Sequence, residues 1–583
     1  MKLSNLNKKL FLFIFLFLLP ATVHTEENID IWSKKNFKKE QGITQKEKVD
    51  IKTKSNKIKL TNKNLQKVEI QVTEKFNTQE ENISLYGLYD PGENNFTLNM
   101  WSNSEGTRIQ DTIERISKIK LSNFSEEIFV NTILTNSYLP LNNMTHEEFL
   151  KHKFEWLILN EKDELIETFL SKNNTFPHKA KLIKYLVDRG ISNSNIDEAC
   201  KKINFLNKDI KEPYLERFRI ICLVKDKKID EAQLILDILR EQKLSDKFFD
   251  NKINFLIGFT EKAEPEVLDN NLLNFYLSSI TIKDFKYIPN KKTDKFIWKY
   301  LSTANLLETT NYENKELIKE LEVAANKNNY DKLEIFKIYK AIPFTLNDYL
   351  RADDVYLNLD SINARSLIYQ KYLLSDNEKA KLKYLFLLQR LFKKDKLDNI
   401  FSSYLSDELE LFDFQKIPEE YINFANKNII KEEKNSFKKI KYSDSSYHTS
   451  KIIRYLNEKK LSKKTTEKEI FNVHKKIKKN KKYILSLKDA ALFESLENDG
   501  FKIPKDIKYK KIKGNNSAPV ELSNLVKNNE IGLFTLRLVE LIGEDKITDF
   551  DDQTIYFINN LLNLAGLKKF RDRVLFTTLP LKG

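Results

Sequence analysis

Residues 222–244 read Cys-Leu-Val-Lys-Asp-Lys-Lys-Ile-Asp-Glu-Ala-Gln-Leu-Ile-Leu-Asp-Ile-Leu-Arg-Glu-Gln-Lys-Leu, and they predict how the chain is built. One helix is expected to end at Leu223–Val224, a charged Asp-Lys-Lys turn follows, and Ile229-Asp-Glu-Ala232 opens the next helix. Ala232, Leu236 and Leu239 then recur at the spacing of one helical face. The stretch therefore predicts two helices joined by a short polar turn.

The same pattern recurs along most of the chain after Trp101. Thr145 and Glu148 predict a capping box, and Gly190 is expected to close a later helix. Helical apolar spacing continues at Leu150, Phe154, Leu157, Ile166, Phe169, Leu182, Leu186, Leu317, Leu321, Leu382, Leu385, Leu538, Val539, Ile555 and Ile558. Helices of about 11–18 residues with short turns favour antiparallel pairs stacked in series.

Glycine and proline are scarce, with 12 of each among 583 residues. Each is therefore near 2% of the chain, against usual values of about 7% and 5%. Dinucleotide-binding loops and tight hairpins both need glycine. The composition thus excludes those classes and predicts an all-α protein, a superhelical α-solenoid of antiparallel helix pairs.

Three segments carry a resemblance to a known class of protein. Residues 222–244 look like a tetratricopeptide-type joint, although the strict 34-residue consensus is not matched. Ala565-Gly-Leu-Lys-Lys-Phe570 is similar, and Tyr86-Gly-Leu-Tyr-Asp-Pro91 forms an aromatic lead-in before Trp101. Together they resemble uncharacterised bacterial exported helical-repeat (TPR-like) envelope proteins, a resemblance that implies no catalytic residues. The lead-in is either an aromatic recognition loop or a cap that seals the first helix pair.

The N-terminus predicts export. Lys2, Lys8 and Lys9 precede an apolar run from Leu10 to Leu19, so residues 1–25 are expected to be a signal peptide. The run is shorter than the ~20 residues of a spanning helix, and cleavage is expected after Ala21 or Thr25, with an uncleaved inner-membrane anchor as the alternative. Periplasmic localisation follows. The polar residues 26–82 predict a disordered linker, with a short strand around Val68–Val72 as an option.

The remaining chain divides by composition into a helical-repeat array (83–430), a lysine-rich helical segment (431–513) and C-terminal helical repeats (514–583). Residues 431–513 hold 25 basic and 11 acidic residues, nearly all of the net charge of +15. Thr466 and Glu469 predict a capping box there, and Ile470, Val473 and Ile477 predict a buried stripe.

The lysine-rich segment supports two interpretations. The candidate contacts for an anionic membrane or cell-wall surface are Lys475, Lys476, Lys478, Lys479, Lys481 and Lys482. The alternative is a solvated surface that reflects a lysine-rich composition. Since lysine lacks the planar fork with which arginine reads bases and grips phosphates, no nucleic-acid partner is expected.

The chain has two cysteines, and they predict a disulfide. Cys200 and Cys222 lie on apolar faces of two helices that a turn near 207–211 would make antiparallel. An oxidising periplasm would then join them. Two buried free thiols are the alternative.

No catalytic motif is recognisable. His146 and His152 are six residues apart, whereas a zinc-binding helix needs histidines four apart. We therefore expect no enzyme, metal or cofactor. The predicted function is an exported scaffold that binds a protein, peptide or polymer partner in the bacterial envelope. The alternatives are a cell-wall-acting enzyme with an unrecognised site and a structural bridge to an anionic membrane or wall surface.

Overall fold

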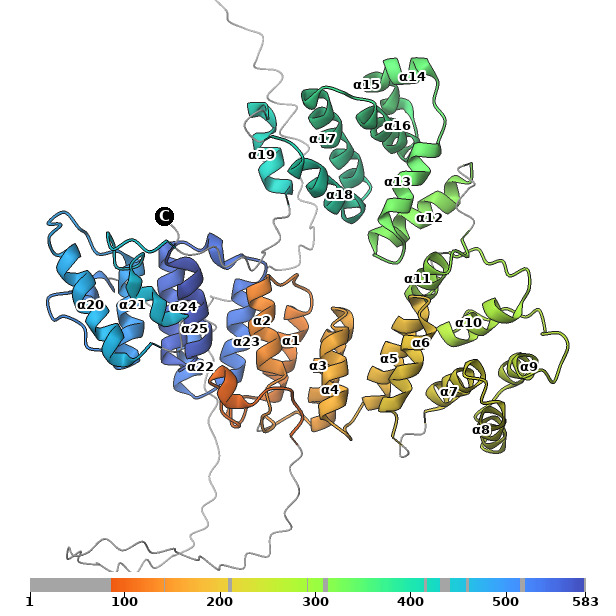
Figure 1. The fold of residues 1–583 in the computed structure, drawn as a ribbon, viewed down its shortest axis with the longest axis horizontal. Coiled ribbons are helices and arrows are strands. Elements are labelled where there is room, and N and C mark those ends of the chain that lie inside the picture. The colour runs from red at the N-terminus through yellow and green to blue at the C-terminus, as the bar shows by residue number, and fades with distance from the viewer. Residues whose placement is uncertain are drawn as a thin grey trace, which may run out of the picture. The chain divides into compact units, whose positions relative to one another are not determined.

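The computed structural model (Figure 1) describes residues 85–140, 142–207, 212–290, 292–307, 313–413, 417–429, 441–457, 461–513 and 519–580. These ranges contain 25 α-helices, and they contain no β-strand beyond isolated bridges. The predicted all-α fold class is confirmed. The predicted signal peptide, the polar linker and the strand around Val68–Val72 lie outside the described residues.

The first eleven helices contribute to one hydrophobic core. They are α1 (Gly106–Ile116), α2 (Asn123–Ile133), α3 (His146–Leu159), α4 (Asp163–Lys172), α5 (Lys179–Ser192), α6 (Ile196–Lys202), α7 (Pro213–Lys225), α8 (Ile229–Glu241), α9 (Lys247–Leu256), α10 (Leu272–Thr281) and α11 (Lys295–Thr303). The predicted joint is confirmed, because α7 and α8 pack together and Ala232, Leu236 and Leu239 are buried. The superhelical course of such pairs stays a prediction.

Two predicted helix ends have different outcomes. The capping box at Thr145 is confirmed, with Glu148 closing it reciprocally. Gly190, however, lies inside α5 and does not end it, so that prediction is wrong. A Cβ atom at Gly190 would lie 2.6 Å from the Cβ of Ala199 in α6. The glycine therefore permits close packing of α5 on α6, a need that local sequence does not reveal.

A second core holds the middle of the chain. Its helices are α12 (Lys315–Asn326), α13 (Lys332–Ala341), α14 (Leu346–Leu350), α15 (Ala352–Val355), α16 (Ser361–Leu373), α17 (Glu378–Lys394), α18 (Asp398–Glu410) and α19 (Glu419–Asn428). The buried Arg365 guanidinium donates to both carboxylate oxygens of Glu322, at 2.7 and 2.8 Å. Tyr339 donates to the same carboxylate. The charges in this core are thus paired.

A third core is built from α20 (Lys463–Ile477), α21 (Leu487–Asn498) and parts of the last two helices. The C-terminal helices are α22 (Val520–Lys527), α23 (Ile531–Ile542), α24 (Asp552–Leu564) and α25 (Lys568–Thr578). These four helices also contribute to the first core. The C-terminal part of the chain thus returns to pack on its beginning, as α23 beside α1 and α2 shows (Figure 1).

Trp101 lies at the centre of this return. Its side chain is fully buried, 5.5 Å between ring centroids from Phe149 of α3. A Cβ atom at Gly532 of α23 would lie 2.4 Å from the indole ring, so only glycine fits there. The Gly532 amide also donates to the Met100 carbonyl at 2.8 Å. Reading Trp101 as part of a recognition loop is therefore wrong, and it belongs to a cap that seals α23 as well as the first helices.

Candidate anionic-surface site

The lysine-rich helix α20 begins earlier than its sequence predicts. Ser462 is the N-cap, and its hydroxyl accepts a hydrogen bond from the Thr465 amide at 3.2 Å. The predicted capping box of Thr466 and Glu469 is wrong, because Thr466 is buried inside the helix and Glu469 pairs with Arg454 at 3.3 Å. Ser462 is thus the hydroxyl residue that caps the first turn, a role that serine favours.

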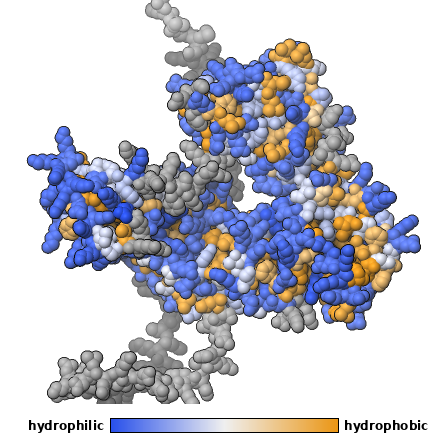
Figure 2. Space-filling model, in the orientation of Figure 1, coloured by the Kyte–Doolittle hydropathy of each residue, from blue (hydrophilic) through white to orange (hydrophobic). Residues whose placement is uncertain are grey.

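The buried face of α20 sets the direction of its lysines. Ile470, Val473 and Ile477 are buried in the third core, which confirms the predicted apolar stripe. The opposite face therefore points to solvent, since residues three and four apart share a helical face. Figure 2 shows this end of the molecule as largely hydrophilic. All six candidate lysines are exposed there.

Two of the six lysines tie α20 to its neighbouring loops. Lys476 Nζ lies 2.6 Å from Asp444 Oδ2, and Lys478 Nζ lies 2.7 Å from Asp506 Oδ2. His474 Nε2 also lies 3.0 Å from the Asp506 carboxylate. Lys478 and then His474 hold the pKa of Asp506 down at about 2. These two lysines thus have internal partners at neutral pH.

The other four candidates have no such partner in the described part of the chain. Lys475, Lys479, Lys481 and Lys482, hereafter the lysine quartet, form no ion pair with any residue that the structure describes. They lie at the C-terminal end of α20 and in the turn that follows it. Lysines close together in sequence repel one another unless an anion is near. The quartet is therefore the part of the predicted set that is open to an external partner.

A hydrogen-bonded cluster fixes the turn beneath the quartet. The fully buried Asp489 accepts hydrogen bonds from His448 Nδ1 at 2.8 Å and from the Tyr483 hydroxyl at 2.6 Å. Burial alone would raise the pKa of Asp489, but the hydrogen bonds from His448 and Tyr483 outweigh it and lower the pKa. This cluster was not predicted from the sequence, although Ser486 and Asp489 carry capping-box spacing.

This cluster lacks the geometry of a catalytic triad. Ser486 Oγ lies 3.5 Å from Nδ1 of His448, the same ring nitrogen that faces Asp489. A triad histidine contacts its serine and its aspartate through different nitrogens. The arrangement therefore orients a turn, and it offers no activated nucleophile.

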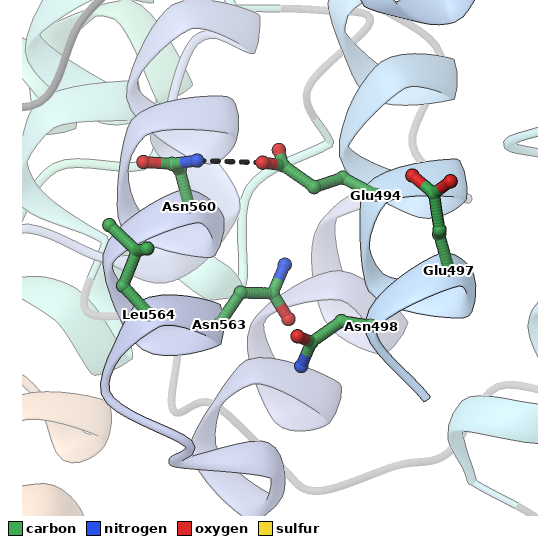
Figure 3. Close-up of a pocket in the computed structure, with 6 residues that line it drawn as sticks. All are labelled: Glu494, Glu497, Asn498, Asn560, Asn563 and Leu564. Carbon is green, nitrogen blue, oxygen red and sulfur yellow. Dashed lines mark hydrogen bonds between the residues drawn. The ribbon is translucent and has the colours of Figure 1, made fainter. Parts of the chain in front are cut away.

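A shallow pocket of about 240 Å³ lies between α21 and α24 (Figure 3). Its lining residues are Glu494, Glu497, Asn498, Asn560, Asn563 and Leu564. Asn560 Nδ2 donates to Glu494 Oε1 at 2.7 Å. Hydrogen bonds from Tyr509 and Lys510 lower the pKa of Glu497. A glycosidase general acid needs the opposite shift, so Glu497 does not fit that role.

The disulfide joins Cys200 of α6 to Cys222 of α7, with 5.7 Å between their Cα atoms. The predicted pairing is confirmed, and the alternative of two free thiols is wrong. The disulfide closes the α6–α7 hairpin. Cross-linking such a loop restricts the unfolded chain and is worth roughly 3 kcal/mol.

The described ranges contain no cluster of three or more side chains that could hold a metal ion. Within the same ranges, no helix combines the length and the hydrophobicity of a membrane-spanning segment. No protein-family model, curated protein or solved structure matches the chain.

Proposed function

We propose that the chain is an exported helical scaffold of the bacterial envelope, and that the lysine quartet holds it against an anionic surface there. The observation that supports this most directly is the division among the six candidate lysines. Two are neutralised by Asp444 and Asp506, and four are left exposed without an ion pair to a described residue. The four lie within eight consecutive residues, 475–482, so they bring four charges to the end of α20 and the turn after it.

The electrostatic gain suits a dense anionic surface. Each lysine near such a surface contributes roughly 1 kcal/mol, so four give useful but reversible binding. Lysine ammonium groups are point charges without the arginine fork, which suits a surface of phosphates and not the reading of bases. The remaining packed helices would offer a second surface, to which the protein, peptide or polymer partner binds.

Periplasmic export is part of the proposal. The Cys200–Cys222 disulfide supports it, because structural disulfides persist in oxidising compartments and are rare in the cytosol. The rival proposal of a cell-wall-acting enzyme has its best support in the carboxylate-lined pocket between α21 and α24. Its weakness is that Glu497 is already bound to Tyr509 and Lys510.

A binding assay with a matched charge control tests the proposal. The probes are immobilised inorganic polyphosphate and vesicles that contain phosphatidylglycerol. Changing the whole lysine quartet to Glu is expected to abolish binding to both at moderate ionic strength. The control changes four exposed lysines on the helices around the second core to Glu. These are Lys327, Lys340, Lys393 and Lys394, and none of them forms an ion pair with a described residue.

Both variants lower the net charge equally, so their difference reports position and not total charge. Retained binding in the control supports the proposal. Equal loss in both variants would show that only the overall charge of +15 matters, and the proposal would then fail.

A further inference from the structure

Two large apolar side chains are exposed among the lysines of α20 and its turn. Phe471 is 45% exposed and Ile484 is 86% exposed. Phe471 follows Lys468 by three residues and precedes Lys475 by four, so all three share the outward face of the helix. Ile484 comes two residues after Lys482. Each apolar residue is thus close in sequence to cations of the quartet.

Neither side chain is part of the third core. The residues that α20 contributes to that core are Ile470, Val473 and Ile477. An exposed apolar residue alone needs no explanation. Here a phenylalanine and an isoleucine are exposed within a cluster of cations that form no ion pair with a described residue. This combination points to a ligand with two properties, negative charge and hydrocarbon.

We propose that this face docks on an anionic phospholipid bilayer, with the lysines at the head groups and Phe471 and Ile484 entering the interface. The inference rests on the proposed function and names the surface that the quartet contacts. A phosphate polymer would satisfy the lysines equally well. It would offer nothing to the two apolar side chains, whereas a bilayer stabilises both groups at once.

The docking is shallow. An in-plane amphipathic helix inserts its whole apolar face, but that face of α20 is already buried in the third core. The folded unit therefore rests on the bilayer, and two side chains enter it. Binding of this kind is reversible and weakens with salt, because screening at physiological ionic strength acts over roughly 8 Å.

The exposed leucines of α14 lack this combination. Leu346 and Leu350 of α14 are each 74% exposed, one turn apart. That short helix contains no lysine, and its only charged residue is Asp348. Nothing in the structure indicates what would cover those leucines. Leu346 is, however, a suitable control for the experiment.

The experiment measures co-sedimentation of the full chain with phosphatidylcholine vesicles with or without phosphatidylglycerol, and retention on immobilised polyphosphate. Phe471→Ser and Ile484→Ser are each expected to weaken binding to the phosphatidylglycerol vesicles about tenfold, the value of roughly half-burying a large apolar side chain. Retention on polyphosphate should not change. Phe471→Leu should restore most vesicle binding, and Leu346→Ser should leave it intact.

The outcomes separate the two proposals. If Phe471→Ser and Ile484→Ser bind vesicles as tightly as the wild type while the Glu quartet does not bind, the bilayer inference is overturned and the anionic-surface function stands. If both serine variants lose retention on polyphosphate as well, their effect is on folding, and the inference also fails. If the Glu quartet binds both probes like the wild type, the proposed function itself is wrong.

Discussion

The contact of α23 with α1 and α2 and the outer face of α20 use cations in opposite ways. In the first contact, Arg108 lies 3.0 Å from Glu530 and Arg115 lies 2.6 Å from Glu540, each pair bridging more than 400 residues of sequence. At the end of α20 and in the turn after it, the lysine quartet meets no carboxylate of a described residue. The same class of charge thus forms an internal tie in one region and an open surface in the other.

Arginine and lysine differ in which of these two roles they take. Most of the chain's 13 arginines form ion pairs, including the buried Arg365 with Glu322 and the buried Arg571 with Asp499. Arginine suits fixed, bidentate ties, whereas lysine keeps a mobile, well-hydrated charge. The open surface therefore consists of lysine, of which a smaller share than of arginine forms ion pairs among the described residues. This teaches that a lysine-rich composition becomes informative only once the paired cations are separated from the unpaired ones.

The largest expected effect is the loss of the contact of α23 with α1 and α2 when Trp101 is removed. Trp101→Ala would leave a cavity between α3 and α23, at a cost of about 3–5 kcal/mol in the free energy of unfolding. Urea denaturation measures this loss. Hydrogen exchange should also show that residues 106–116 and 531–542 lose protection together, because the indole packs on Gly532.

Trp298→Ala is the matched control, since Trp298 is buried in the second core. It is expected to cost a similar amount without exposing α23 to exchange. Unchanged protection of α23 in Trp101→Ala would contradict the role given to the cap.

Lys153 sharpens the comparison, because it is a lysine inside the first core that forms no ion pair with a residue of the described ranges. It is 2% exposed, and its Nζ lies 4.1 Å from the Phe149 ring centroid. Burial lowers the pKa of Lys153 from 10.5 to about 7. The unfolded chain therefore binds the proton more tightly, and stability falls as the pH drops from 10.5 to 7. Lys153→Met is expected to raise the free energy of unfolding by roughly 2–4 kcal/mol near neutral pH.

Urea denaturation at about pH 6 and about pH 9 checks the sign. The advantage of Lys153→Met over the wild type should be full at the lower pH and smaller at the higher. Lys151→Met, which replaces an exposed lysine of the same helix, should show neither change. An equal advantage at both pH values would rule out the buried charge as the cause.

Sequence periodicity was sufficient for the local structure but not for the contacts between distant segments. The α7–α8 joint, the Thr145 capping box and the disulfide all depend on residues at most 22 positions apart, and each was predictable. The packing of Trp101 on Gly532 joins segments more than 400 residues apart, and neither residue signals the other. Gly190 shows the same limit, because the residue that requires a glycine there is Ala199 on the next helix, α6.

The candidate site was predictable as a cluster, but not its internal division. Charge counting found all six lysines, because they lie close together in the sequence. It could not find Asp444 and Asp506, which the fold brings to Lys476 and Lys478 from opposite sides in sequence. Nor could it distinguish Phe471 from Ile470, one residue away. That difference depends on which face of α20 the third core covers.

The smallest expected effect concerns one of the two tied lysines. Lys478→Met removes the main cause of the low pKa of Asp506, so this pKa should rise from about 2 toward 3.8. The lowered pKa contributes stability above pH 3.8 that is lost as the pH falls toward 2, and the variant should lose much of this acid dependence. An NMR titration of the Asp506 carboxyl measures the shift, and Lys479→Met, which removes an untied neighbour, should not reproduce it. An unchanged pKa would mean that His474 alone holds the carboxylate, and Lys478 would then belong with the open surface.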